Sequence, residues 1–134
     1  MDFVEIFNNS YKRNIDGQYD RFFNQFYDNF MGKSDAIKKA FRNTNMEMQK
    51  LMLEDSLLYM KGFSIRRQSS EALEDLAALH RRLNIDASYF EIWLESLVET
   101  IEQIDPKCDE NDLLAWRIIL SPGIEFMKGF KQDG

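Results

Sequence analysis

The sequence predicts an all-α fold of six or seven helices, and three observations predict that class. Six aromatic residues between positions 19 and 30 recur at steps of three and four, the spacing that places side chains on one face of a helix. A second broad apolar face, between positions 90 and 104, has the same period. Strand-like alternation does not persist anywhere in the chain, and Gly and Pro are scarce.

Three helices are expected before position 42. The first covers about residues 4–11 and is weakly amphipathic, with an interruption expected at its Asn-Asn-Ser cluster. Asp16 is the expected N-cap of the second helix, which carries the aromatic stripe, and Gly32 is its expected C-cap. A short third helix should begin at Ser34-Asp35 and lead to Phe41.

The next two helices are predicted from a capping pattern and from the histidine segment. Thr44 and Glu47 have the capping-box spacing, so a helix should begin there and end near Lys61. Gly62 then opens a polar, basic connection, and the histidine helix begins near Glu71. One face of the earlier helix mixes polar and apolar residues, namely Gln49, Leu53, Ser56 and Met60.

Two longer helices complete the predicted fold. Asp86 or Ser88 is expected to cap the first of them, which should end at Asp105-Pro106. Acidic residues within 109–112 supply the N-terminus of the second. Because Pro122 removes a backbone donor, this last helix is expected to be kinked there or divided in two.

Length, charge and cysteine content restrict the class of protein. The 134 residues fit one domain, residues 1–134, that can bury a core without disulfides. The formal net charge of −6 argues against a nucleic-acid partner, because such surfaces need clustered Lys and Arg. The chain shows no long apolar run and no signal peptide, so no membrane partner is expected. A single cysteine, Cys108, fits a reducing compartment, and we expect a cytoplasmic protein.

Familiar catalytic and metal-binding patterns are missing from the sequence. It has no zinc-ligand spacing, no phosphate-cradling glycine loop and no dinucleotide-binding fingerprint. Carboxylate-bundle metal sites need Glu-x-x-His pairs, which a chain with one histidine cannot supply. Cys108 lies in a polar segment between helices and is best interpreted as an ordinary loop thiol.

The single histidine, His80, shares an apolar helical face with Leu73, Leu76 and Ala77. An imidazole there is either a core residue whose nitrogens bond locally or a ligand for something bound inside the protein. The chain is rich in flat side chains, with eleven Phe, five Tyr and two Trp. A core of this kind can line a cavity for a flat apolar ligand, although plain aromatic packing has the same composition.

Three segments, taken in order, resemble parts of a globin. Phe26-Tyr27-Asp28-Asn29-Phe30 through Ile37-Lys38-Lys39-Ala40-Phe41 resembles bacterial flavohaemoglobins, and Phe41 through Leu57 is similar to bacterial single-domain and sensor-type globins. Residues 76–93 resemble the family pattern of a proximal histidine, an isoleucine five residues later and an aromatic residue near the start of the next helix. The resemblance covers about residues 17–130. It departs from the family in the basic loop before the histidine helix, in Pro122, and in lacking a reductase or output domain after Phe130.

The resemblance implies a globin-like fold around a haem pocket that holds haem b. His80 would coordinate the haem iron through one ring nitrogen, while the other donates to a nearby backbone carbonyl or hydroxyl. Phe41 would pack on the porphyrin face. Arg82, beside Arg81, would reach the haem propionates, although such a pair is more often a solvated helical face.

The same resemblance implies a gas-binding side of the pocket. Tyr27 and Gln49 would donate hydrogen bonds to a bound diatomic ligand, and Leu53 would shape the ligand pocket. The alternative is that Tyr27 is one more ring of the aromatic stripe and Gln49 is a solvated helix residue. Phe90 and Trp93 would support the histidine side without touching the ligand.

Reversible binding of oxygen or nitric oxide, for sensing, storage or detoxification, is the function that the resemblance implies, with carbon monoxide as a further ligand. Nitric oxide dioxygenation would need an external reductase. The alternative is a haem-free globin module for protein interaction or signalling, in which side chains fill the cavity. A reductase or signalling partner and a homodimer through the last two helices remain open.

Overall fold

Seven α-helices and one π-helical segment make up residues 1–130, the part of the chain that a computed structural model describes. That range contains no strand, and the predicted all-α class is confirmed. The elements are α1 (Phe3–Tyr11), η1 (Lys12–Asp16, π-helical), α2 (Tyr19–Gly32), α3 (Asp35–Ala40), α4 (Met46–Arg66), α5 (Glu71–Arg82), α6 (Ser88–Ile104) and α7 (Glu110–Gly129). Residues 131–134, the end of the predicted single domain, lie outside the described residues. None of the described helices is both long and apolar enough to cross a membrane.

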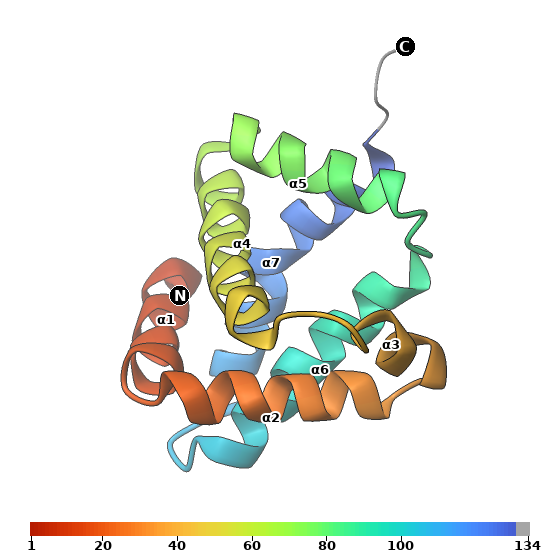
Figure 1. Cartoon of the computed structure of the whole chain (residues 1–134). Helices are drawn as coiled ribbons and strands as arrows, with labels where there is room; N and C mark the ends of the chain where they lie inside the picture. Colours follow the sequence, from red (N-terminus) through yellow and green to blue (C-terminus); the bar gives the residue numbers. More distant parts are fainter. Residues whose placement is uncertain (131–134) are drawn as a thin grey trace.

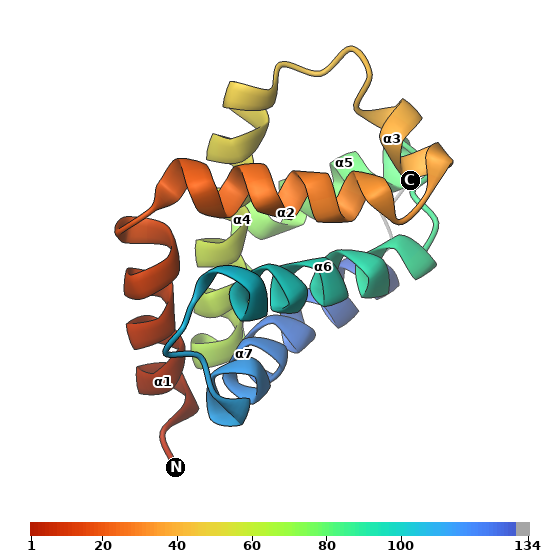
Figure 2. The ribbon, with the colours of Figure 1, turned by 90° about the horizontal axis from the view of Figure 1, so that it is seen from below.

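The helices pack around a hydrophobic core to which α7 contributes along most of its length. Helices α1 and α4 pack against α7, and α2 packs against α6. In Figure 1, α2, α4 and α5 form three sides of a frame with α6 and α7 behind it, and Figure 2 shows α2 beside α6 from below. Trp116 of α7 is fully buried, and its ring centroid lies 4.6 Å from that of Phe7 in α1. Gly123 lets α4 and α7 approach closely, since a Cβ there would lie 2.5 Å from Met60 Cγ.

Three predicted helix starts are confirmed. Ser34 Oγ accepts hydrogen bonds from two backbone N–H groups in the first turn of α3. Ser70 Oγ accepts from the N–H of Leu73, so α5 begins at Glu71 as expected. Asp109 and Asp112 form a reciprocal capping box at the start of α7.

The N-terminal helical stretch differs from the prediction. Helix α1 is not interrupted at its Asn-Asn-Ser cluster and continues directly into η1. Ser10, the last residue of that cluster, is buried; its carbonyl accepts from Asn14 Nδ2 at 2.8 Å and its Oγ accepts from Trp116 Nε1 at 2.9 Å. Asp16 is therefore the last residue of η1 and not an N-cap. The N-cap of α2 is Gln18, whose side chain makes no capping hydrogen bond.

The predicted start of α4 was wrong by one residue. Asn45, and not Thr44, is the N-cap, and its Oδ1 accepts from the N–H groups of Glu47 at 3.1 Å and Met48 at 3.2 Å. Asn satisfies the free N–H groups of a first turn better than Thr. The Thr44–Glu47 capping box is consequently not formed.

The predicted end of α4 near Lys61 was also wrong, because the helix runs through Gly62 to Arg66. Phe63 packs on Phe126 of α7, with ring centroids 5.2 Å apart. This tertiary contact outweighs the low helix propensity of a glycine. The helix ends where Arg67 takes a left-handed conformation with φ of 56°.

Three smaller boundary predictions need correction. Gly32 is the last residue of α2, and the C-cap is Lys33 in a right-handed conformation. The N-cap of α6 is Ala87, although Asp86 Oδ1 does accept from the N–H of Ser88 at 2.9 Å. Of the two outcomes expected at Pro122, a kink or a division, the division is wrong, because Pro122 lies inside a single 20-residue helix.

Candidate functional site

A cavity of about 300 Å³ lies inside the frame of helices, and its lining side chains come from α2 to α7 and from the loops after α3 and α5. Its lining is mostly apolar, and the polar lining residues are Tyr27, Thr44, Gln49, Ser56, His80 and Tyr89. Ala40, Met52 and Leu83 line it and are exposed, so they mark its opening to solvent. An apolar cavity with a few convergent polar groups is the usual form of a small-molecule site, and roughly 300–1,000 Å³ is the usual volume.

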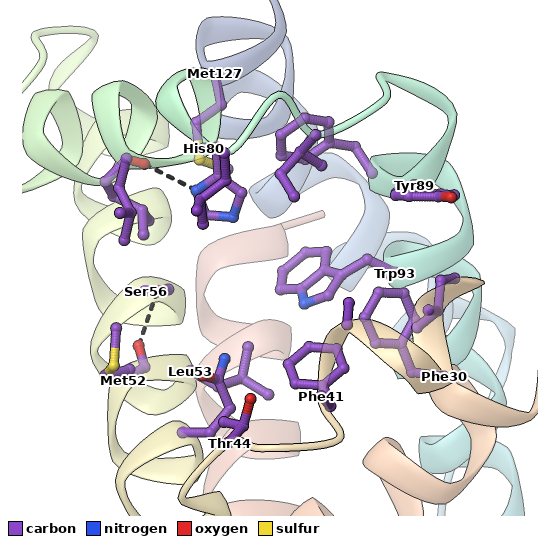
Figure 3. A pocket seen from close by; sticks show the side chains of 18 of the residues that line it. Phe30, Phe41, Thr44, Met52, Leu53, Ser56, His80, Tyr89, Trp93 and Met127 are labelled. Atoms are coloured by element: carbon purple, nitrogen blue, oxygen red, sulfur yellow. Dashed lines mark hydrogen bonds between the residues drawn. The ribbon is translucent and has the colours of Figure 1, made fainter. Parts of the chain in front are cut away.

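His80 reaches into this cavity from α5, as Figure 3 shows. Its Nδ1 lies 2.8 Å from the carbonyl oxygen of Leu76, one turn earlier. A carbonyl can only accept, so Nδ1 carries a proton, and in the neutral imidazole Nε2 is then the nitrogen with the lone pair. Phe90 packs against the imidazole, with ring centroids 5.6 Å apart. The hydrogen bond and the packing therefore hold the ring with Nε2 on the cavity side.

Leu53 and Thr44 lie across the cavity from His80 (Figure 3). Tyr27 of α2 reaches the same side, because its hydroxyl donates to the backbone carbonyl of Gln49 at 3.3 Å, one turn before Leu53 on α4. The Tyr27 side chain is buried, and burial raises the pKa of its phenol well above the ordinary value near 10. The hydroxyl is therefore protonated at neutral pH and acts as a hydrogen-bond donor.

Flat side chains form another wall of the cavity. Phe41, from the loop after α3, stands beside Tyr27 and Phe30, with ring centroids 5.7 and 6.0 Å away. Trp93 of α6 lies near it in Figure 3 and packs edge-on against Phe26 at 6.3 Å. Phe41 is only partly buried by protein, whereas Phe26 is fully buried. Aromatic surface is thus left facing the cavity.

Comparisons with known proteins bear on the family and the fold of the chain. No family model matches the chain. A group 1 truncated hemoglobin of Tetrahymena thermophila is 30% identical over 70 residues, which are 52% of this chain and 54% of that relative. The chain therefore matches about half the length of this curated relative. A crystal structure of a Pseudomonas aeruginosa protein, described as structurally highly homologous to a human hemoglobin, superposes with a TM-score of 0.86 at 28% identity, covering 95% of this chain and 96% of that one. The chain belongs to the globin superfamily.

Five of the six site residues predicted from the sequence line the cavity of this globin. They are Tyr27, Phe41, Gln49, Leu53 and His80. They come from α2, the loop after α3, α4 and α5, so the fold brings together positions up to 53 residues apart in the sequence (80 − 27). Arg82 is exposed and is not among the lining residues, and Arg81 donates from Nη1 to the carbonyl of Phe130 at 3.0 Å.

Several lining residues of the globin cavity were not predicted as site residues. Ser56 and Met60 line it together with Gln49 and Leu53, and the sequence carried a signal for them, since all four fall on one helical face. Thr44, Met52, Tyr89 and Met127 had no such signal. Phe90 and Trp93, which were expected to support the histidine side, are also lining residues.

The donor set distinguishes a haem from a bare metal ion. Within residues 1–130, no group of three or more His, Cys, Asp or Glu side chains could hold an ion. A single imidazole nitrogen is sufficient for a metal whose other ligands belong to its cofactor, as the porphyrin nitrogens do for haem iron. The flat rings of Phe41 and Trp93 provide apolar walls for such a planar group. The residues present therefore fit a haem.

Cys108 takes no part in this site. It lies between α6 and α7 and is not a lining residue. Burial, followed by the carboxylates of Asp112 and Asp105, raises the pKa of its thiol to about 11. The thiol is protonated at neutral pH and is not an activated nucleophile, as the sequence interpretation expected.

Proposed function

We propose that this globin binds haem b through His80 and, on that haem, a diatomic gas such as oxygen or nitric oxide. The observation that carries the proposal is the orientation of the His80 ring, whose Nδ1–H donates a hydrogen bond to the Leu76 carbonyl while Nε2 faces an apolar cavity. If His80 were only a core residue, its second ring nitrogen would be expected to contact protein atoms and not to face a cavity. Phe41 would pack on the porphyrin face, which would cover its remaining exposed surface.

The carboxylate groups of a haem would project to solvent, and Arg82 is the residue proposed to meet them. It directly precedes Leu83, which marks the opening of the cavity. Arg82 is exposed, so its guanidinium is free to move toward a carboxylate at this edge. An ion pair in such a position contributes little, about 0–1 kcal/mol.

Bound haem would supply an iron with an open coordination position for the gas. The residues of the chain then determine how a bound ligand is held. A diatomic ligand that becomes partly anionic gains from the Tyr27 O–H and from the Gln49 side-chain N–H, whereas carbon monoxide, being less polarised, gains less. Tyr27 now donates to the Gln49 carbonyl, so turning its hydroxyl toward a ligand would cost about one neutral hydrogen bond, roughly 1 kcal/mol. Leu53 limits the space beside this donor.

The physiological role proposed for the gas complex is sensing, storage or detoxification by a cytoplasmic single-domain protein spanning residues 1–134. Turnover as a nitric oxide dioxygenase would require an external reductase to return the iron to its ferrous state. A signalling protein that distinguishes the liganded from the unliganded state is the corresponding partner for a sensor.

A haem titration of the purified chain tests this proposal. We expect an intense Soret band that saturates at one haem per chain and shifts when the reduced protein is exposed to carbon monoxide. The control is the same titration in denaturant, where nonspecific uptake by an unfolded chain would appear without saturation at this ratio. A flat titration of the folded protein would contradict the proposal and favour a haem-free interaction module.

A further inference from the structure

A second cavity, of about 400 Å³, opens to solvent where α3 and the loop after it meet the end of α2 and the start of α4. We call it the α3 cavity, and the cavity that His80 enters the His80 cavity. Figure 2 shows α3 beside the C-terminal end of α2, against which it packs. Phe41 lines both cavities, and it is the only residue that they share. The proposed haem site therefore leaves the α3 cavity without a role.

The more buried part of the lining, the apolar floor, consists of Met31, Phe41 and Met46. All three are partly buried and pack against the hydrophobic core. Methionine is unbranched and polarisable, so it adapts to ligands of irregular or variable shape. Two methionines beside one aromatic ring therefore suit a flexible alkyl chain better than a rigid planar group.

The exposed part of the lining, the basic rim, carries Lys38, Lys39 and Arg42. None of these three takes part in an ion pair among the described residues. Asp35 is the single carboxylate of the lining, so three positive charges and one negative charge give the rim a net charge of +2, whereas the whole chain has −6. Positive charge gathered at one cavity of an acidic protein attracts an anion to that place.

We propose that the α3 cavity binds a fatty acid in its carboxylate form, with the alkyl tail on the apolar floor and the carboxylate at the basic rim. A small inorganic anion would leave the floor uncovered, and a neutral alkane would leave the rim cations without a partner. A ligand with one apolar tail and one anionic head matches both parts of the lining. The volume of about 400 Å³ lies within the usual range of small-molecule sites, roughly 300–1,000 Å³.

The two parts of such a ligand contribute differently to its affinity. Burial of the alkyl tail supplies most of the binding free energy, because it removes apolar area from water. Each exposed ion pair changes the dissociation constant by a factor of about 1.4–5. Decanoate should therefore bind at least about fivefold more tightly than decanol, which has the same tail and no charge. Added salt should reduce this difference, since it screens exposed charges.

A titration of the full, haem-free chain with decanoate, followed by NMR of methionine methyl groups, tests the proposal. The methyl groups separate the two cavities, because Met31 and Met46 line only the α3 cavity, whereas Met52, Met60 and Met127 line only the His80 cavity. Single Met→Leu variants assign the signals. We expect saturable shifts of the Met31 and Met46 signals. Shifts confined to the other three methionines, or no saturable shift, would overturn the proposal and would leave the haem titration unaffected.

Charge variants test the rim. Lys38→Glu and Arg42→Glu should each raise the dissociation constant of decanoate about threefold or more, and Asp35→Asn should lower it. Lys107→Glu is the matched control, because Lys107 is an exposed lysine between α6 and α7 that lines neither cavity. Far-UV circular dichroism checks that each variant is folded. Rim variants that bind decanoate as tightly as Lys107→Glu would overturn the proposal.

Discussion

Replacing Tyr27 with Phe removes one hydroxyl from the gas-binding side of the proposed haem pocket and changes little else. The Tyr27 ring is 3% exposed and packs edge-on against Phe26 at 5.0 Å, so a Phe ring retains the same packing. What disappears is the hydrogen bond of 3.3 Å from the hydroxyl to the Gln49 carbonyl. The haem-free variant should be destabilised by about 1 kcal/mol, the usual value for one neutral hydrogen bond.

The effect on oxygen release follows from two opposing terms. A hydrogen bond from Tyr27 to a partly anionic ligand is worth roughly 1.5–3 kcal/mol, and turning the hydroxyl away from Gln49 costs roughly 1 kcal/mol. The net stabilisation lost in Tyr27→Phe is therefore roughly 0.5–2 kcal/mol. Oxygen should leave the variant about 2–30 times faster than the parent. Carbon monoxide is less polarised, and its release should change much less.

Stopped-flow displacement of oxygen by carbon monoxide measures this rate in the parent and in Tyr27→Phe, and displacement of carbon monoxide by nitric oxide gives the internal control. A selective increase in oxygen release is the predicted result. Equal oxygen release rates would refute a hydrogen bond from Tyr27 to the ligand. Equal acceleration of both gases would instead indicate a change in pocket shape, which also contradicts the reasoning.

Three further predictions concern the fold and the thiol. Gly123→Ala should destabilise the protein by roughly 1–3 kcal/mol in urea denaturation, because the added Cβ would lie 2.5 Å from a side chain of α4, while Gly129→Ala, with nothing within 4 Å, should not. Asn45→Ala should cost about 1 kcal/mol through loss of the α4 N-cap, and Thr44→Ala should cost measurably less; the reverse order would contradict the cap assignment. Cys108 should react with iodoacetamide about a hundredfold more slowly at pH 8 than a free cysteine, because its pKa is raised to about 11. A Cys108 thiol that reacts at the rate of a free cysteine would contradict the raised pKa. Because the folded pKa lies above the unfolded value, any stability that this thiol contributes is present below about pH 9 and is lost as the pH rises through about 11.

Helices α2 and α6 of this globin were predictable because each carries a strong local period. The aromatic stripe of α2 and the apolar face of α6 are properties of short segments, and both are buried as their spacing predicts. The boundaries that failed depend on contacts from elsewhere in the fold. Asn14 bonds to Asp105 across the molecule, and Phe63 draws α4 past Gly62 by packing on α7. These contacts join residues that are far apart in the sequence, so the local spacing of apolar residues does not predict them.

The site was predictable from the sequence only in part, and mainly through the order of motifs that resembles a globin. His80 was identifiable as an imidazole on an apolar face, but whether it had a cavity in front of it depended on five other helices and two loops. Thr44 and Met127 line that cavity because the loop after α3 and the end of α7 converge there. Neither residue belongs to a motif, so sequence reasoning had no signal for them.

Chemical rescue of a His80→Gly variant is the measurement that tests the central claim most directly. Glycine removes the imidazole and leaves a space that free imidazole can enter. The variant should lose stoichiometric haem binding and its Soret band, and added imidazole should restore both, because the ligand is returned to the iron without its attachment to α5. If the variant retains haem with an unchanged spectrum and no response to imidazole, then His80 is not the ligand and the proposed haem site is wrong.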